Sequence, residues 1–204
     1  MNIASRKHRA VPFSFFYHHM LRDVIATVEA EYDREAGHDY SHRVTNAIVL
    51  AAFATEATAN EIGYWLQVHH TQPVAVTGKF EDYRIREKWQ FLAHCHGAPG
   101  FVETGQPWVD FATFVDLRNA LVHPGAYTDP STKLLRVLDR LDSLGCTRPG
   151  ADWLESAMTV RTARWVRDTI LAMPEALRQM LAPRLDLHNE GFSWVWEPDR
   201  LSAM

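Results

Sequence analysis

The sequence is poor in cysteine, in long apolar runs and in net positive charge. Its two cysteines, Cys95 and Cys146, are too few for a disulfide framework and lack C-x-x-C spacing. This favours a reducing compartment and predicts a cytoplasmic protein. No stretch has the roughly 18 apolar residues that cross a bilayer, and the basic start lacks the apolar run of a signal peptide, so we expect no membrane partner. With a formal net charge of −4 and a pI of about 6.2, any site for nucleic acid must be local.

The short motifs of several enzyme classes are also absent. The chain has no G-x-G-x-x-G, phosphate-binding P-loop, G-x-S-x-G or H-E-x-x-H string. Its histidines cluster at 18–19, 69–70 and 94–96, but neighbouring histidines on a helix point apart and make no tetrahedral set of ligands. We therefore expect neither a metal nor a cofactor.

What the chain does have is a composition and a periodicity typical of a helical domain. It is 47% hydrophobic and 23% charged, which is ordinary for a globular protein. We expect an all-α, up-and-down bundle of about five helices in a single domain spanning 1–204, with its core at about 13–175 and a C-terminal tail at 184–204. The apolar spacing predicts helices at 13–35, 42–68, 80–96, 108–122 and 153–173, and a short helix, or alternatively a strand, within 134–141.

Two of these helices have informative faces. In the first, apolar residues recur in steps of four and are predicted to share one buried face: Phe16, Met20, Val24, Val28 and Tyr32. The second is apolar or small on nearly every side, which is typical of a helix in the middle of a core. Between Val44 and Asn60 its only charge is Glu56.

The helix at 108–122 carries an arginine against its apolar stripe. The stripe is formed by Phe111, Phe114, Val115, Leu121 and Val122, and Arg118 stands where the spacing calls for another apolar residue. Because an unpaired buried guanidinium is costly, Arg118 must face a carboxylate, a cleft or a second subunit. Asn119 and His123 lie four apart, and so share a face beside it. The helix C-terminus favours a charged His123 and Arg118 disfavours it, which can leave the imidazole titrating near neutrality.

The string Asp116-Leu-Arg-Asn-Ala-Leu-Val-His-Pro124 resembles the R-x4-6-H signature of the HEPN superfamily. Further similarity lies in the E-x-x-x-N-E pattern within 52–62, and in the segments 88–92 and 108–111. The resemblance implies a helical bundle that dimerises, so that two motifs line one composite cleft, often that of a metal-independent ribonuclease. It implies that Arg118 stabilises the phosphate, His123 transfers a proton and Asn119 orients one of them. Some toxin-type members have a tyrosine two places after the histidine, where this chain has Gly125.

Three functions stay open on these observations. The first is a homodimeric, metal-independent endoribonuclease, and the second is a non-catalytic HEPN-like module that binds RNA or a cognate regulatory protein. The third is a helical ligand-binding domain with an arginine-anchored anion pocket. A purely structural role for the motif also fits, with Arg118 paired to an acid, Asn119 capping the helix and His123 bonding a free carbonyl.

The second helix also supplies two residues that can support the site. Glu56 and Asn60 share one of its faces. They either hold Arg118 in place from across the bundle or belong to a separate structural contact. In the structural alternative, Glu56 forms a salt bridge to Lys88 or Arg43.

Overall fold

The computed structural model describes residues 13–32, 41–69, 80, 82–94, 97–122, 130–150 and 152–185, and every regular element within these ranges is an α-helix. The expectation of an all-α fold is therefore confirmed. The helices are α1 (Phe13–Tyr32), α2 (Ser41–His69), α3 (Ile85–His94), α4 (Trp108–Val122), α5 (Thr132–Ser143), α6 (Trp153–Ala157) and α7 (Val160–Leu181).

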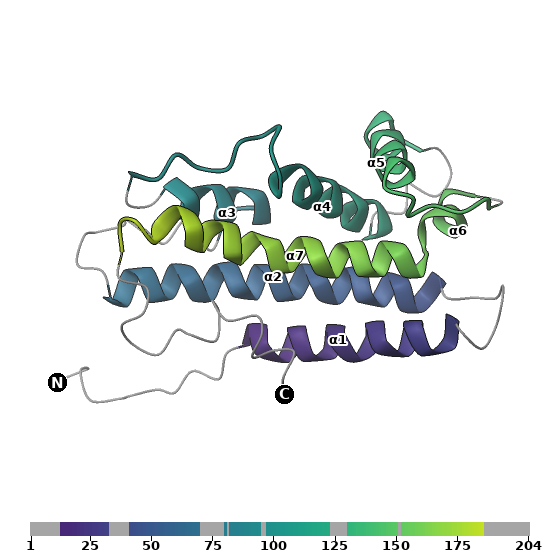
Figure 1. The fold of residues 1–204 in the computed structure, drawn as a ribbon, viewed down its shortest axis with the longest axis horizontal. Helices are drawn as coiled ribbons and strands as arrows, with labels where there is room; N and C mark the ends of the chain where they lie inside the picture. Colours follow the sequence, from purple (N-terminus) through teal and green to yellow (C-terminus); the bar gives the residue numbers. More distant parts are fainter. Residues whose placement is uncertain are drawn as a thin grey trace.

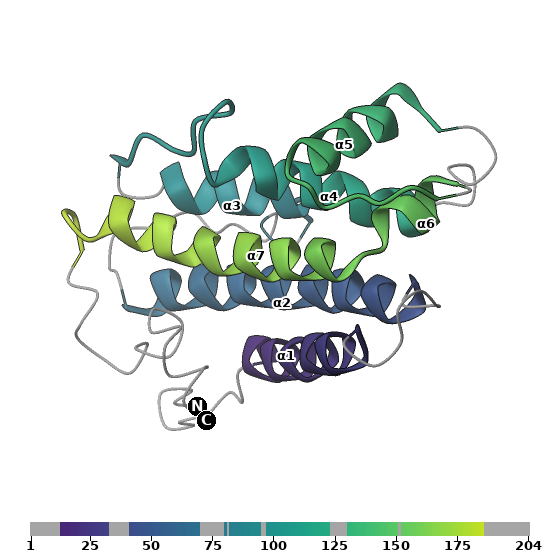
Figure 2. The ribbon, with the colours of Figure 1, turned by 45° about the vertical axis from the view of Figure 1, so that its right-hand side comes forward.

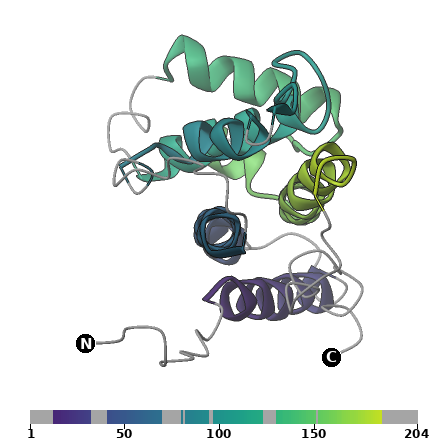
Figure 3. The same ribbon diagram turned by 90° about the vertical axis from the view of Figure 1, so that its left-hand side faces the viewer.

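The long helix α2 lies at the centre of the bundle (Figure 1). It packs against α1 on one side and against α3, α4 and α7 on the other. Viewed along the bundle, α1, α2 and the α3–α4 layer follow one another, with α7 to one side and α5 outermost (Figure 3). The helices α5 and α6 sit together at one end, against α4 and the start of α7 (Figure 2). No helix in the described part of the chain is both long and apolar enough to span a membrane.

The prediction for α2 is confirmed by its burial. Its core residues are fully buried, and many are small, which lets the neighbouring helices approach closely: Val44, Ala47, Ile48, Ala51, Ala54, Ala59, Ile62 and Leu66. Gly63 allows close packing in the same way, because a Cβ atom there would lie 2.9 Å from Cε1 of Phe80.

The buried face predicted for α1 is partly wrong. Phe16 and Met20 are 53% and 50% exposed, whereas Leu21 and Ile25 are only 2% exposed. A helix turns about 100° per residue, so each step of four residues drifts by about 40°. A series of such steps therefore winds around the helix, so that Val24 is partly buried against the core and Val28 is fully buried.

Two predicted boundaries also differ. The helix expected to begin at Phe80 begins at Ile85, because Phe80 lies in a turn and packs its ring against Gly63. The single helix expected at 153–173 is divided into α6 and α7, and α7 continues to Leu181. The division occurs at Thr159, whose hydroxyl accepts a hydrogen bond from the Thr162 amide at 3.1 Å and caps α7.

The segment within 134–141 is helical, as its spacing favoured, and the strand alternative is not realised. Residues 186–204 of the predicted tail lie outside the described residues.

Candidate functional site

The buried apolar stripe of α4 is continuous, because Leu117 fills the place in it that the sequence analysis assigned to Arg118. Phe111, Phe114 and Leu117 are all fully buried, while Val122, predicted to be inside, is 44% exposed. The stripe thus advances by three, three and then four residues to Leu121, which is as regular for a helix as the predicted spacing. Arg118 lies one position around the helix from this stripe, at its edge.

At that edge Arg118 and Asn119 line a cleft of about 700 Å³. The cleft is formed by α2, by the start of α3 with the residues before it, by α4, and by the first turn of α5. The prediction that Arg118 faces a carboxylate, a cleft or a second subunit is met by this cleft. The lining residues are Ala52, Phe53, Glu56, Tyr83, Arg84, Ile85, Arg86, Glu87, Phe114, Val115, Asp116, Arg118, Asn119 and Lys133.

The guanidinium of Arg118 is only partly satisfied. Its Nη1 donates to Oδ1 of Asn119 at 3.1 Å. Its Nε is buried and has no hydrogen-bond acceptor among the described residues. A buried donor without an acceptor costs about 1 to 3 kcal/mol. The Nε of Arg86, which lines the same cleft, is likewise buried without an acceptor among the described residues.

Next to Arg118, Asp116 holds two cations at one oxygen. Its Oδ1 lies 2.5 Å from Nη2 of Arg86 and 2.7 Å from Nζ of Lys133. These distances are those of ion pairs, but Oδ1 accepts no hydrogen bond from the described residues. The two cations therefore neutralise the charge of the carboxylate. Arg86 also donates to the carbonyl oxygen of Ala112 in α4. These contacts tie α3 and α5 to α4 around the cleft.

Glu56 lines the same cleft but pairs elsewhere. Its Oε1 accepts from Nζ of Lys88 at 2.9 Å, so the direct pairing predicted with Arg118 is wrong and the structural alternative holds. The side chain of Lys88 is 3% exposed and that of Glu56 is 45% exposed. Asn60, one turn further along α2, is exposed and is not among the residues that line the cleft.

The remaining predicted residue, His123, lies outside the described residues, as does Gly125. Helix α4 ends at Val122, immediately before it. The structure thus brings Arg118, Asn119 and Glu56 to one cleft, and the role of His123 stays a prediction.

Sequence reasoning missed several residues of the cleft. Asp116 stands within the motif string but had no assigned role. Tyr83, Arg86 and Lys133 gave no local signal, because each reaches the cleft only through the packing of α3 against α2 and of α5 against α4.

A separate polar cluster lies between α1 and α2. The amide and hydroxyl of Ser14 donate to the Glu61 carboxylate at 3.0 and 2.5 Å, and burial raises the pKa of Glu61. Beside it, a ring nitrogen of His18 lies 3.3 Å from the Thr58 hydroxyl. Burial, with a smaller effect of His19, lowers the pKa of His18 to about 4. The Glu61 carboxylate thus accepts a hydrogen bond from a backbone amide in the first turn of α1. In the described ranges, no group of three or more His, Cys, Asp or Glu side chains is arranged to hold a metal ion.

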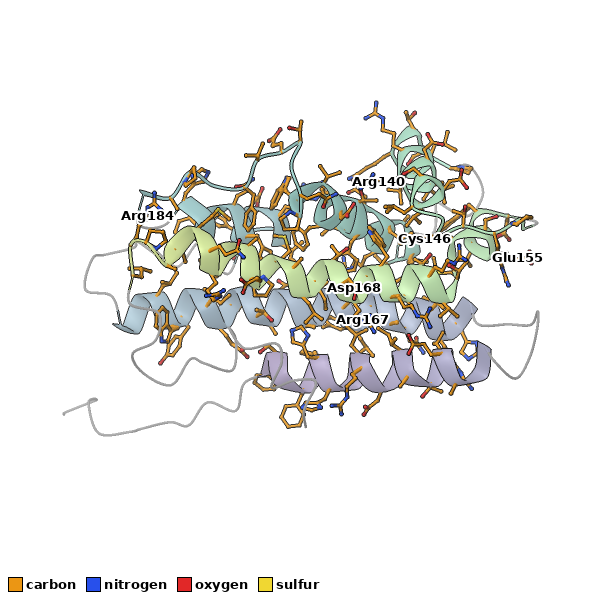
Figure 4. All side chains as sticks on the ribbon, in the orientation of Figure 1. Arg140, Cys146, Glu155, Arg167, Asp168 and Arg184 are labelled. Atoms are coloured by element: carbon orange, nitrogen blue, oxygen red, sulfur yellow. The ribbon has the colours of Figure 1, made fainter. Side chains whose placement is uncertain are left out.

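A second hollow, of about 530 Å³, lies on the face that carries the start of α7. Cys146 and Trp165 contribute to its lining, and Figure 4 shows Arg140 and Cys146 on the side of α5, with Asp168 on α7. The pKa of the Cys146 thiol is raised, chiefly by burial, which keeps it protonated and unreactive. Asp110 also lines this hollow. It already accepts two hydrogen bonds from Arg140.

No family model matches the chain, and neither a curated protein nor a solved structure matches it. The HEPN resemblance therefore rests on the sequence patterns alone.

Proposed function

We propose that the cleft beside α4 binds a phosphodiester of RNA, and that the chain acts as a homodimeric, metal-independent endoribonuclease. The observation that carries the proposal is the guanidinium of Arg118, which lines a cleft of about 700 Å³ and is bonded, among the described residues, only to Asn119. Guanidinium groups bind phosphate oxygens through paired N–H donors. Asn119 holds one end of the guanidinium and leaves the other donors for a ligand.

The chemistry follows from these groups. The ribose 2′-oxygen attacks phosphorus, the bond to the 5′-oxygen breaks, and a 2′,3′-cyclic phosphate remains. The 2′-hydroxyl gives up its proton and the leaving 5′-oxygen gains one; we assign these transfers to His123 of the two copies. Arg118 stabilises the negative charge that accumulates on the phosphate oxygens in the transition state.

The exposed face of α1 and α2 supports a homodimer. On α1 the exposed apolar side chains are spaced for one helix face, and α2 adds an exposed phenylalanine and an exposed tyrosine. These residues are Phe13, Phe16, Met20, Phe53 and Tyr64, between 45% and 68% exposed. Such a concentration of exposed apolar side chains is typical of an interaction surface, and Phe53 reaches from it into the cleft.

The second candidate is RNA binding or regulation without cleavage. It is favoured by Gly125, which stands where some toxin-type HEPN ribonucleases have a tyrosine. In this case Arg118 still binds the phosphate, and a cognate regulatory protein is a further partner.

The test incubates the purified protein with mixed RNA in the presence of a chelator. We expect cleavage that leaves 2′,3′-cyclic phosphate ends, and light scattering at twice the chain mass of 23.4 kDa. Arg118→Ala and His123→Ala should each abolish cleavage without changing the dimer or the melting temperature. Arg167→Ala, which removes a cation that pairs with its neighbour Asp168 on α7, is the matched control and should cleave normally.

Cleavage that is unchanged in either motif variant would show that the activity comes from a contaminant or another site. RNA binding that depends on Arg118, without cleavage by the wild type, would support the second candidate. A monomer at micromolar concentration would contradict the composite cleft.

A further inference from the structure

Tyr83 contributes an aromatic ring to the cleft that holds Arg118. It lies between the turn at Phe80 and the first residue of α3, Ile85, and it is partly exposed. Both Tyr83 and Arg118 line the same hollow, together with Arg84 at its edge. An aromatic ring and a guanidinium thus share one cleft.

Among the described residues, no ring lies parallel to that of Tyr83. Phe80 and Phe91 each meet it at an interplanar angle of 64°, with centroids 6.1 and 5.7 Å away. These are edge-to-face contacts, which restrain the ring without stacking flat on it. The other aromatic residue of the cleft, Phe53, differs because Tyr17 lies over it at 5.6 Å and 30°. Tyr83 is thus the ring of the cleft for which the described residues supply no stacked partner.

The neighbours of Tyr83 are themselves held in place. Phe80 is 5% exposed and packs against Gly63 of α2. The Nζ of Lys88 lies 5.9 Å from the centre of the Phe80 ring. Phe91 also contacts Phe80, at 5.5 Å. A ring restrained in this way loses little conformational freedom when a ligand stacks on it.

We infer that the cleft accepts an unpaired RNA base on the ring of Tyr83 while Arg118 holds a phosphate of the same strand. The inference rests on the proposed function and names its substrate class, which is single-stranded RNA. Bases are flat and apolar on both faces, and they stack on aromatic side chains with little dependence on sequence. A base inside a duplex is already stacked and paired, and it would have to leave the helix to reach Tyr83. Duplex RNA is therefore a poor ligand for this cleft.

The experiment measures dissociation constants by fluorescence anisotropy for three labelled probes. They are a 2′-O-methyl oligoadenylate, which lacks the 2′-hydroxyl and cannot be cleaved, the same backbone with abasic residues, and the oligoadenylate in a duplex. The proteins are the wild type, Tyr83→Leu, Tyr83→Phe and Arg118→Met. Circular dichroism and light scattering check the fold and the oligomeric state of each variant.

We expect the wild type to bind the single strand on the order of tenfold or more tighter than the abasic strand or the duplex. Tyr83→Leu should reduce the affinity for the single strand to that for the abasic strand and leave the abasic affinity unchanged. Tyr83→Phe keeps the ring and should bind as the wild type does. Arg118→Met should weaken binding of all three probes.

Several results would overturn the inference. Equal affinity of the wild type for the single strand and the abasic strand would do so without any variant, even if Tyr83→Leu failed to fold. An unchanged single-strand affinity in Tyr83→Leu, or an equal loss for the abasic strand, would show that the ring does not carry a base. If Arg118→Met still weakened binding in those cases, the proposed function would stand without the inference. If the wild type bound none of the probes, both would fail.

Discussion

The ion pair between Lys88 and Glu56 gives an asymmetric prediction for stability. Nζ of Lys88 donates to Glu56 at 2.9 Å, and the lysine side chain is 3% exposed while the glutamate is 45% exposed. Glu56→Ala would leave a buried ammonium without its carboxylate. Loss of one partner costs about 3 to 5 kcal/mol in a fully buried pair and about 0 to 1 kcal/mol in an exposed pair. This pair lies between the two cases, so we expect a loss of about 2 to 3 kcal/mol.

The converse substitution should cost much less. Lys88→Met keeps an apolar stem against the Phe80 ring and removes the buried charge, while Glu56 can be hydrated at the surface. We expect a change within about 1 kcal/mol of zero. The Glu56→Ala loss should largely disappear when Lys88→Met is already present.

The assay is urea unfolding of the wild type, the two single variants and the double variant at one protein concentration, since a dimer unfolds in a concentration-dependent way. For a chain of this length, the Glu56→Ala loss corresponds to a fall in melting temperature of roughly 4 to 12 °C. A Glu56→Ala loss that is the same in both backgrounds would refute the reasoning. A parallel cycle with Arg118→Met should be additive, because Glu56 and Arg118 do not pair.

Three further predictions concern burial and packing. Burial lowers the pKa of His18 from 6.5 to about 4, so stability is retained above about pH 6.5 and lost as pH falls toward 4. Urea midpoints at pH 7 and pH 5 should show a loss of about 1 to 2 kcal/mol that His18→Leu lacks. Gly63→Ala should lower the melting temperature despite its helix propensity, because the new Cβ would lie 2.9 Å from Phe80; a higher melting temperature would mean that Phe80 moves aside freely. Leu117→Ala should cost about 2 to 5 kcal/mol in chemical denaturation, whereas Arg118→Met should change stability by less than about 1 kcal/mol; the opposite order would mean that Arg118 is the inward residue.

The fold could be predicted where local signals are strong. The bounds of α4, Trp108–Val122, match the prediction because an apolar periodic segment ends just before Pro124. The central position of α2 followed from its lack of charge. The start of α3 differs from the prediction because the Tyr83 amide closes a turn by donating to the Phe80 carbonyl oxygen at 3.2 Å, and apolar spacing does not reveal such a turn.

The break between α6 and α7 has a similar origin. It depends on Thr159, whose hydroxyl also donates to the carbonyl oxygen of Cys146, a contact outside either helix. Periodicity continues through such a break, so spacing alone predicted one helix. The exposed face of α1 was missed for a different reason, since a four-residue step drifts around the helix.

For the candidate site, the sequence identified Arg118 as a misplaced cation but not its surroundings. Spacing within α4 showed that an arginine stood beside an apolar stripe. It could not show that Leu117 completes the stripe, nor that Glu56 would pair with Lys88. The choice among several oppositely charged residues is made by tertiary packing, which a single helix pattern does not contain.

An acidic chain can still hold an anion in this cleft because its acids there are already engaged. Glu56 pairs with Lys88, Glu87 accepts from the backbone amide of Arg84 at 2.7 Å, and Asp116 lies against two cations. Of the seven charged side chains that line the cleft, four are cationic, so an entering phosphate meets a local positive excess. That excess is small, and Arg118 contributes one of its charges. Binding of single-stranded RNA should therefore weaken only modestly with salt, with a slope of log K against log salt of about −0.7 to −1.4, equivalent to one or two phosphate contacts. A potassium chloride titration of the oligoadenylate affinity measures this slope, and the slope should fall toward zero in Arg118→Met. A much steeper slope that survives the substitution would place the RNA on a different, more basic surface.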